Sequence, residues 1–144
     1  MIMSVPRGFI HACAAVLVAV GCAGCGSDTS PSPNVPFSQT DLRIGTGADV
    51  ANGKTLTVTY SGWLYDSTQP DNKGTLFQTA PSYQFVLGTG AVIAGWDQGI
   101  LGMKAGGLRR LVIPPNLAYG SAGNPPSIPA NATLVFEIGV ISVQ

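Results

Sequence analysis

The cysteine thiols and the histidine imidazole, the side chains most often used as thiolate nucleophiles and as zinc or copper ligands, all lie near the amino terminus. Cys13, Cys22 and Cys25 are the only cysteines of the 144-residue chain, and His11 is its only histidine. The rest of the chain therefore has no thiolate nucleophile, no disulfide and no Ser-His or Cys-His pair. It also lacks the usual ligands of zinc and copper, so we expect neither a metal nor a cofactor there.

Cys22 and Cys25 each follow small residues at the end of an apolar run over residues 9–24. That run is too short for a comfortable membrane span, which is typical of an export signal over residues 1–25. Its end is similar to the lipobox of bacterial lipoproteins, where the thiol after the cleavage site receives diacylglycerol. Cys25 fits slightly better than Cys22. We expect a lipid anchor at the periplasmic face of a bacterial membrane; the alternative is an ordinary secretory signal that leaves a soluble periplasmic or secreted protein.

A polar, proline-rich stretch follows over residues 26–41. Its prolines favour an extended conformation and forbid a packed helix, so we interpret it as a tether. The folded domain is then expected over residues 42–144, with the chain entering the fold between Phe37 and Leu42.

The composition narrows the kind of domain. Hydrophobic residues make up 45% of the chain and charged residues 10%, while glycine (19) and proline (11) are frequent. This balance is too apolar for a disordered chain and too interrupted for a helical bundle, so it favours short strands joined by turns. Seven basic and seven acidic residues cancel, and the only adjacent basic pair is Arg109–Arg110. We therefore expect no nucleic-acid partner.

The elements that position any site are read from hydrophobic periodicity. Strands are predicted over 54–60, 83–87, 108–113 and 133–141, and one short helix over 91–101. The expected core residues are Leu56, Val58, Leu111, Ile113, Leu134 and Ile138. The predicted fold class is α+β, with an antiparallel sheet of about five strands wrapped over one short helix.

Four local sequences occur in the order in which one family carries them. They are Tyr60–Leu64, Phe85–Trp96, Gly102–Gly120 and Ile128–Phe136. Together they resemble the Tyr-(Thr/Ser)-Gly opening, the pocket-floor segment, the central strand with its following loop, and the ending Ile-Pro-x-x-(Ala/Ser)-x-Leu-x-Phe of FKBP-type peptidyl-prolyl cis-trans isomerases. The resemblance covers nearly all of residues 42–144 and implies that family's fold and activity.

The resemblance also implies a site. Trp96 would be the floor on which the substrate proline lies, and the Ile93 backbone N–H and the Tyr119 hydroxyl would donate hydrogen bonds to substrate carbonyls. The implied catalytic set is Tyr60, Phe77, Gln78, Ile93, Trp96, Tyr119 and Phe136, and the implied substrate-binding residues are Tyr83, Val92 and Ile128, the last closing the rim. Taken singly, each apolar member of this set is an ordinary core residue.

Two features depart from the family pattern. The residue after the Phe77 equivalent is commonly a buried Asp paired with an arginine; here it is Gln78, and residues 79–82 contain no arginine. The acid and the base are lost together, which avoids an unpaired buried charge. Residues 64–76 are also longer than the compact form of the family and predict an enlarged surface loop near the pocket edge.

The chemistry of such a site requires no nucleophile. Twisting an X-Pro bond breaks amide resonance, and an apolar, water-poor pocket favours the less polar twisted amide over the planar one. The resemblance implies a peptidyl-prolyl cis-trans isomerase that acts on proline-containing polypeptides among exported proteins, and we expect it to be a monomer. Two alternatives stay open: a weakly active module or chaperone that binds proline-rich segments, and a structural lipoprotein in which the fold is only a scaffold.

Overall fold

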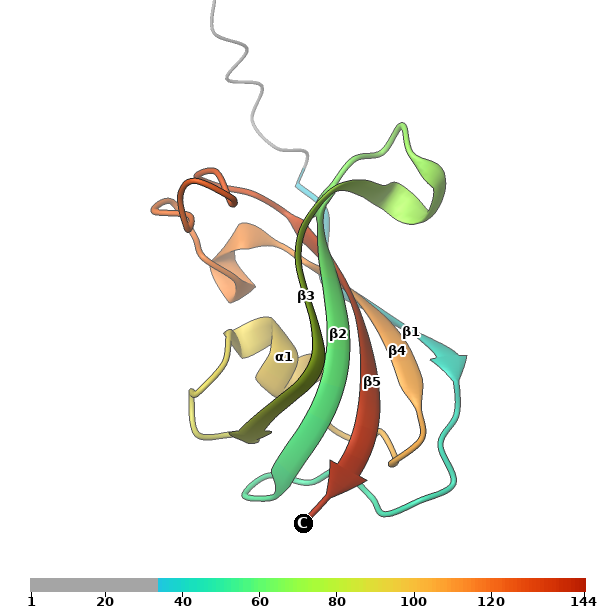
Figure 1. The fold of residues 1–144 in the computed structure, drawn as a ribbon. Helices are drawn as coiled ribbons and strands as arrows, with labels where there is room; N and C mark the ends of the chain where they lie inside the picture. Colours follow the sequence, from blue (N-terminus) through green and yellow to red (C-terminus); the bar gives the residue numbers. More distant parts are fainter. Residues whose placement is uncertain (1–33) are drawn as a thin grey trace, which may run out of the picture.

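The computed structural model describes residues 34–144 (Figure 1). The predicted signal peptide over residues 1–25, with Cys22 and Cys25, lies outside the described residues, as does the predicted tether up to residue 33. Within residues 34–144, no helix has the length and apolar character needed to cross a membrane.

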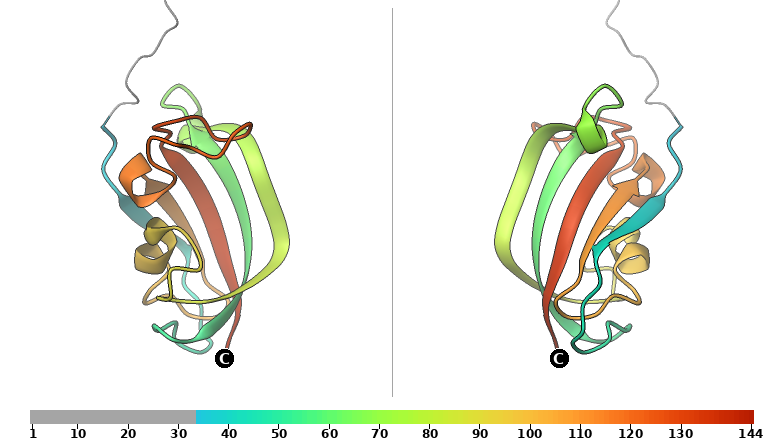
Figure 2. Two further views of the ribbon diagram at one scale, coloured as in Figure 1. Left: turned by 90° about the vertical axis from the view of Figure 1, so that its left-hand side faces the viewer. Right: turned by 90° about the vertical axis from the view of Figure 1, so that its right-hand side faces the viewer.

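Five strands form one antiparallel sheet in the order β1-β4-β5-β2-β3. They are β1 (Ser38–Arg43), β2 (Thr55–Tyr65), β3 (Lys73–Val86), β4 (Leu108–Ile113) and β5 (Leu134–Val143). The sheet curves around one short helix, α1 (Ala94–Gly99), which lies against its inner face (Figure 2). This confirms the predicted α+β class. Two 3₁₀ turns, Pro70–Asn72 and Pro115–Leu117, lie in the connections.

The core lies between the sheet and α1. Alternation along the strands turns one set of apolar side chains toward the helix, and every core residue expected from the sequence has 0% exposure: Leu56, Val58, Leu111, Ile113, Leu134 and Ile138. Full burial of such a side chain contributes about 1.5–3 kcal/mol relative to leaving it in water. The alternating pattern thus identifies the face of the sheet that packs against α1, and a site can form on that face.

Helix α1 is shorter than the 91–101 segment predicted from its apolar spacing. It begins after Ile93, whose backbone is extended, and ends at Gly99. Two glycines let it approach β4 closely: a Cβ added at Gly95 would collide with Ile113, and one at Gly99 would lie 2.6 Å from Leu111 Cδ1. The helix therefore rests directly on β4.

Strand β1 adds an element that no apolar alternation indicated. It begins at Ser38, so residues 38–41 of the predicted tether are part of the sheet. Asp41 of β1 accepts two hydrogen bonds from Arg109 of β4, Nε to Oδ1 at 2.6 Å and Nη2 to Oδ2 at 3.1 Å.

The same guanidinium also reaches the carboxyl end of the helix. Arg109 Nη1 donates to the carbonyls of Gly99 at 2.8 Å and Leu101 at 3.2 Å. One buried side chain therefore joins β1, β4 and the end of α1. Hydrogen bonding from Arg109 in turn lowers the pKa of the Asp41 carboxyl.

The hairpin between β2 and β3 differs from the enlarged loop predicted over residues 64–76. Strand pairing continues to Tyr65 opposite Lys73, so only residues 66–72 form the turn. The Lys73 ammonium lies 4.6 Å from the centroid of the Trp63 ring, a cation–π contact on the outer face of the hairpin. This contact and the strand pairing order a segment whose turn-forming residues suggested a loop.

An ion network on the outer face ties the hairpin to the centre of the sheet. Glu137 of β5 contacts Lys73 Nζ at 2.5 Å and Arg110 Nη2 at 2.8 Å, and Arg110 Nη1 reaches Asp71 at 2.8 Å. Burial alone would raise the pKa of Glu137, but its hydrogen bonds from Lys73 and Arg110 outweigh that effect and lower it. The network thus holds these charges on the side of the sheet opposite α1.

Candidate functional site

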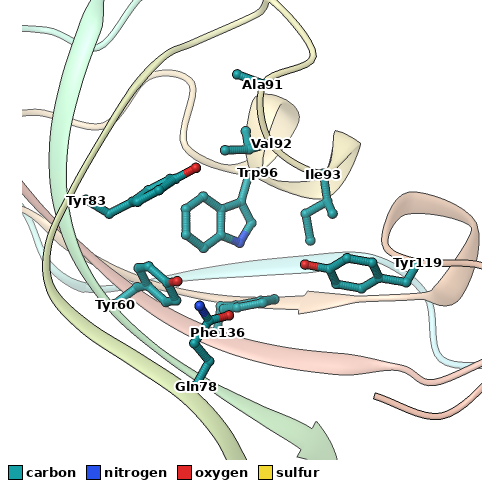
Figure 3. A pocket seen from close by; sticks show the side chains of 9 residues that line it. All are labelled: Tyr60, Gln78, Tyr83, Ala91, Val92, Ile93, Trp96, Tyr119 and Phe136. Atoms are coloured by element: carbon teal, nitrogen blue, oxygen red, sulfur yellow. The ribbon is translucent and has the colours of Figure 1, made fainter. Parts of the chain in front are cut away.

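A pocket opens between α1, the loop before it and the inner face of the sheet (Figure 3). Its volume is about 380 Å³, within the range of about 300–1,000 Å³ typical of small-ligand sites. Mostly aromatic and aliphatic side chains line it: Tyr60, Gln78, Tyr83, Ala91, Val92, Ile93, Trp96, Tyr119 and Phe136. The structure therefore brings together eight side chains that the sequence assigned to one site, and adds Ala91.

Trp96, in the first turn of α1, lies at the bottom of the pocket with 4% of its surface exposed. Its ring packs edge-on against Tyr60 at 4.9 Å and Phe136 at 5.2 Å between centroids. The indole nitrogen is buried without a hydrogen-bond acceptor among the described residues. Figure 3 shows this nitrogen on the side of the ring nearer Phe136, where a perpendicular aromatic face offers a weak acceptor.

Three aromatic side chains form the walls. Tyr60 of β2 lies 6.0 Å from Tyr83 of β3 and 6.2 Å from Phe136 of β5, both in edge-on contacts. Tyr83 is stacked on Phe85 of its own strand at 5.8 Å. These rings come from neighbouring strands and pack against one another, so the fold itself forms the walls.

Phe77 was assigned to the site by sequence but does not line the cavity. It lies behind the wall, edge-on to Phe136 at 5.6 Å. Both rings lie over Gly62, where an added Cβ would stand 2.7 Å from Phe77 Cζ and 2.7 Å from Phe136 Cε1. Phe77 therefore supports a wall residue from outside the cavity.

Ile128 also lies away from the lining. It is 2% exposed and packs in the hydrophobic core, with its backbone paired to Asn124 in an isolated bridge. Ala91 was not predicted to line the site, because a small apolar side chain carries no chemical signal. The only signal in the sequence was its position beside Val92, in the loop after Gly90.

The loop before α1 is fixed by a carboxylate of the helix. Asp97 Oδ1 accepts from the Gly88 N–H at 2.9 Å, and Oδ2 accepts from the Gly90 N–H at 3.3 Å. Both glycines have positive φ, of 81° and 72°, which other residues rarely adopt. This arrangement places Ala91, Val92 and Ile93 along one side of the cavity.

Several polar groups of the lining residues have no hydrogen-bond partner among the described residues. The hydroxyls of Tyr60, Tyr83 and Tyr119 and the Ile93 backbone N–H form no hydrogen bond with any described residue. Burial raises the pKa of Tyr119 and of Tyr60, with a smaller contribution from neighbouring tyrosines. The Tyr60 and Tyr119 hydroxyls therefore stay protonated at neutral pH and can donate to a substrate carbonyl.

Gln78 contributes the one side-chain amide of the described lining. It lies in β3 opposite Gly62 of β2, and Figure 3 shows its amide directed into the cavity between Tyr60 and Phe136. The amide has no hydrogen-bond partner among residues 34–144. It can both donate to and accept from a bound peptide.

Such a pocket binds an apolar ring and orients the polar groups beside it. The floor is Trp96, most of the wall is aromatic, and the polar side-chain groups are three hydroxyls and one amide. No His, Cys, Asp, Glu or Lys side chain lines it within the described chain. The arrangement is suited to changing the conformation of a bound peptide by binding alone.

Comparison with known proteins gives consistent matches. A family model described as FKBP-type peptidyl-prolyl cis-trans isomerase matches residues 47–141. The FK506-binding protein of Neisseria meningitidis serogroup A is 44% identical over 103 residues, which cover 72% of this chain and 92% of that protein. Human peptidyl-prolyl cis-trans isomerase FKBP2 is 50% identical over 92 residues, covering 64% of this chain and 63% of that protein.

A solved structure matches as well. The peptidyl-prolyl cis-trans isomerase of Pseudomonas syringae pv. tomato superposes with a TM-score of 0.64 and 35% identity, covering 75% of each chain. Some relatives are much longer. The chain spans about a quarter of FK506-binding protein 4 of Rhizopus delemar (26%) and of the 46 kDa FK506-binding nuclear protein of Spodoptera frugiperda (24%).

Proposed function

The chain belongs to the family of FKBP-type peptidyl-prolyl cis-trans isomerases, and we propose that its pocket rotates X-Pro bonds of exported proteins by binding the twisted amide in apolar surroundings. The observation that carries the proposal is the open aromatic cavity above Trp96. A structural scaffold alone would have no need of such a cavity.

The physical basis is differential binding of two states of one bond. Rotation of a peptide bond costs about 18–20 kcal/mol because it breaks amide resonance. At the twisted state the carbonyl loses conjugation, and its charge separation falls. A pocket with little water and few dipoles therefore stabilises the twisted amide relative to the planar one.

In this proposal the aromatic residues bind the proline ring, and the hydrogen-bond donors bind the flanking peptide. The proline ring lies on Trp96, between Tyr60 and Phe136, where its apolar surface leaves water. The Ile93 N–H and the Tyr119 hydroxyl donate to carbonyls of the flanking peptide and keep the chain in register. Holding the flanks while the bond turns converts binding free energy into a lower barrier.

An assay of the wild-type protein with Trp96→Ala and Tyr119→Phe tests this directly. We expect acceleration of cis-trans exchange in proline peptides, measured by NMR exchange spectroscopy. Trp96→Ala should lower kcat/KM at least about hundredfold, and Tyr119→Phe about tenfold. If both variants accelerate exchange as fully as the wild type, the assignment of the site to this pocket is wrong, although the family assignment still holds.

A second function is favoured by Gln78, which stands in the pocket as a neutral amide. A weakly active module would bind proline segments through the same cavity and release them unchanged. Saturable peptide binding with no acceleration of exchange, in samples that retain the fold, would select that function over isomerisation.

The exported setting is a proposal of its own and rests on residues 1–25. Acylation of Cys25 or Cys22 would hold the domain at a membrane through the proline-rich tether. We expect metabolic incorporation of a labelled fatty acid into the full chain, lost in the Cys22→Ala/Cys25→Ala variant. Absence of label in the wild type, with the signal still removed, would select the soluble exported form.

A further inference from the structure

The pocket contains no formal charge. Among the described residues, its lining has no Asp, Glu, Lys, Arg or His side chain. Its polar side-chain atoms are three tyrosine hydroxyls and the amide of Gln78. The polar groups that a peptide meets in the cavity are therefore all uncharged.

Most charged side chains of the described domain form ion pairs away from the pocket. Ion pairs join Asp41 to Arg109, Asp49 to Lys104, and Glu137 to Lys73 and Arg110, with Asp71 on Arg110. Glu137 follows the wall residue Phe136 but lies on the outer face of the sheet. Asp97 follows the floor residue Trp96, and both its oxygens accept backbone N–H groups of Gly88 and Gly90.

Gln78 occupies the position from which a charge would act most directly on a bound peptide, because its amide projects into the cavity between two wall residues. We propose that Gln78 is a specificity-determining residue: its neutral amide lets the isomerase accept acidic and basic residues beside the substrate proline with similar efficiency. The substrate class is thus proline-containing segments in which an acidic and a basic residue beside the proline are accepted equally. The inference rests on the proposed function of the same pocket.

The physical reason is that an amide has no net charge and two kinds of hydrogen-bonding atom. Its N–H groups can donate to a substrate carboxylate, and its oxygen can accept from a substrate ammonium. A carboxylate or ammonium at the same position would attract one of these and repel the other, and because Gln78 is exposed, solvent and salt weaken both interactions. Such an interaction acts over about 8–10 Å at moderate salt, which covers the residue beside a bound proline.

The test is a peptide series in which only the residue preceding proline changes, to Leu, Gln, Glu or Lys. Exchange rates are measured by NMR without a coupling protease, whose own preference would bias the series. For the wild type we expect kcat/KM for the Glu and Lys peptides to agree within about threefold. Gln78→Glu should lower the ratio of kcat/KM for the Glu peptide to kcat/KM for the Lys peptide about tenfold. Gln78→Lys should raise the same ratio about tenfold.

Gln84 provides the matched control. It is a second glutamine on the exposed edge strand β3, and its neighbours Tyr83 and Phe85 stack on the core side, so Gln84 faces the other way. Gln84→Glu and Gln84→Lys change the net charge equally, and we expect the peptide ratio to stay within about twofold of the wild type. Raising the salt concentration should shrink the shifts of the Gln78 variants and leave the Gln84 variants unchanged.

Two results would overturn the inference. One is a wild-type ratio beyond about tenfold in either direction; the other is equal ratios in the Gln78 and Gln84 charge variants. If the wild type accelerates none of the peptides, the proposed function fails instead. The charge preference is then read from the ratio of Kd values for the same peptides, with the same expected shifts.

Discussion

At the scale of single residues, the pocket wall depends on a position that has no side chain. Gly62 lies beneath Phe77 and Phe136, and those two rings leave no space for a Cβ. The glycine of the Tyr60-Ser-Gly sequence thus has a packing role: it lets an inner ring line the cavity while an outer ring supports it.

We therefore predict that Gly62→Ala displaces Phe136 and damages the site. Overpacking of this kind costs about 1–3 kcal/mol of unfolding free energy, and misplacing a wall by a few tenths of an ångström should lower kcat/KM about tenfold. Chemical denaturation and the exchange assay measure the two effects. Adding Phe77→Leu gives the new methyl group room, so the double variant should recover part of both; no recovery would contradict this packing role.

The tyrosine hydroxyls give the site its pH dependence. Burial raises the pKa of Tyr60 and Tyr119, so the folded protein keeps these protons to higher pH than the unfolded chain does. Their contribution to stability is complete below the unfolded value of about 10 and falls as the pH rises through the folded values. We expect kcat/KM to be constant from about pH 6 to 9 and to decline only above about pH 10. NMR exchange measures this profile, and an inflection near neutral pH would show that another group titrates in the site.

At the scale of elements, the floor of the pocket depends on how closely α1 approaches β4. Gly95 and Gly99 lie one helical turn apart and face Ile113 and Leu111. Trp96, between them in sequence, is directed into the cavity. The close approach of α1 to β4 at the two glycines therefore determines how far Trp96 lies from the sheet.

Gly95→Ala and Gly99→Ala should each destabilise the protein although alanine is the better helix former. Helix propensity favours alanine by about 1 kcal/mol, but collision with β4 costs more, and we expect a net loss of about 1–2 kcal/mol. Thermal unfolding measures it. Gln98→Ala, at the exposed position between them, is the control and should be neutral or slightly stabilising. A gain in stability at Gly95 would contradict the close approach.

The elements also show what the sequence could predict and why the rest required the structure. Leu56, Val58 and Tyr60 alternate along a half-buried strand, so the period of two revealed β2 directly. Strand β1 is exposed at all six positions, and an edge strand with polar residues has no such period. The start of β3 carries turn-forming residues, and its strand pairing depends on partners in β2 that are distant in sequence.

The candidate site divides in the same way. Family-ordered motifs identified the residues, but only the folded chain separates lining from support, with Phe77 behind the wall and Ile128 in the core. Ala91 enters the lining because the Asp97 carboxylate fixes the preceding loop, a contact across elements that no local pattern encodes.

At the scale of the whole molecule, Arg109 joins three elements that are far apart in the sequence. It is buried, and it binds Asp41 of β1 and two carbonyls at the end of α1. Removing β1 would leave this guanidinium without its carboxylate and expose β4 as a new sheet edge. The first strand is therefore part of the support beneath the pocket floor, although no residue of β1 lines the cavity.

Two truncations test this role. A chain that begins at Phe37 retains β1 and should match the full described domain in unfolding free energy and in kcat/KM. A chain that begins at Ile44 lacks β1 and should have a lower unfolding free energy and a lower kcat/KM. The point variant Asp41→Ala should lower the unfolding free energy by more than the roughly 1 kcal/mol typical of an exposed ion pair and by less than the about 3–5 kcal/mol typical of a buried one. Its loss is intermediate because Asp41 is partly exposed and Arg109 is not. Equal stability of the two truncated chains would show that the domain begins after β1, and that Arg109 is held by its helix contacts alone.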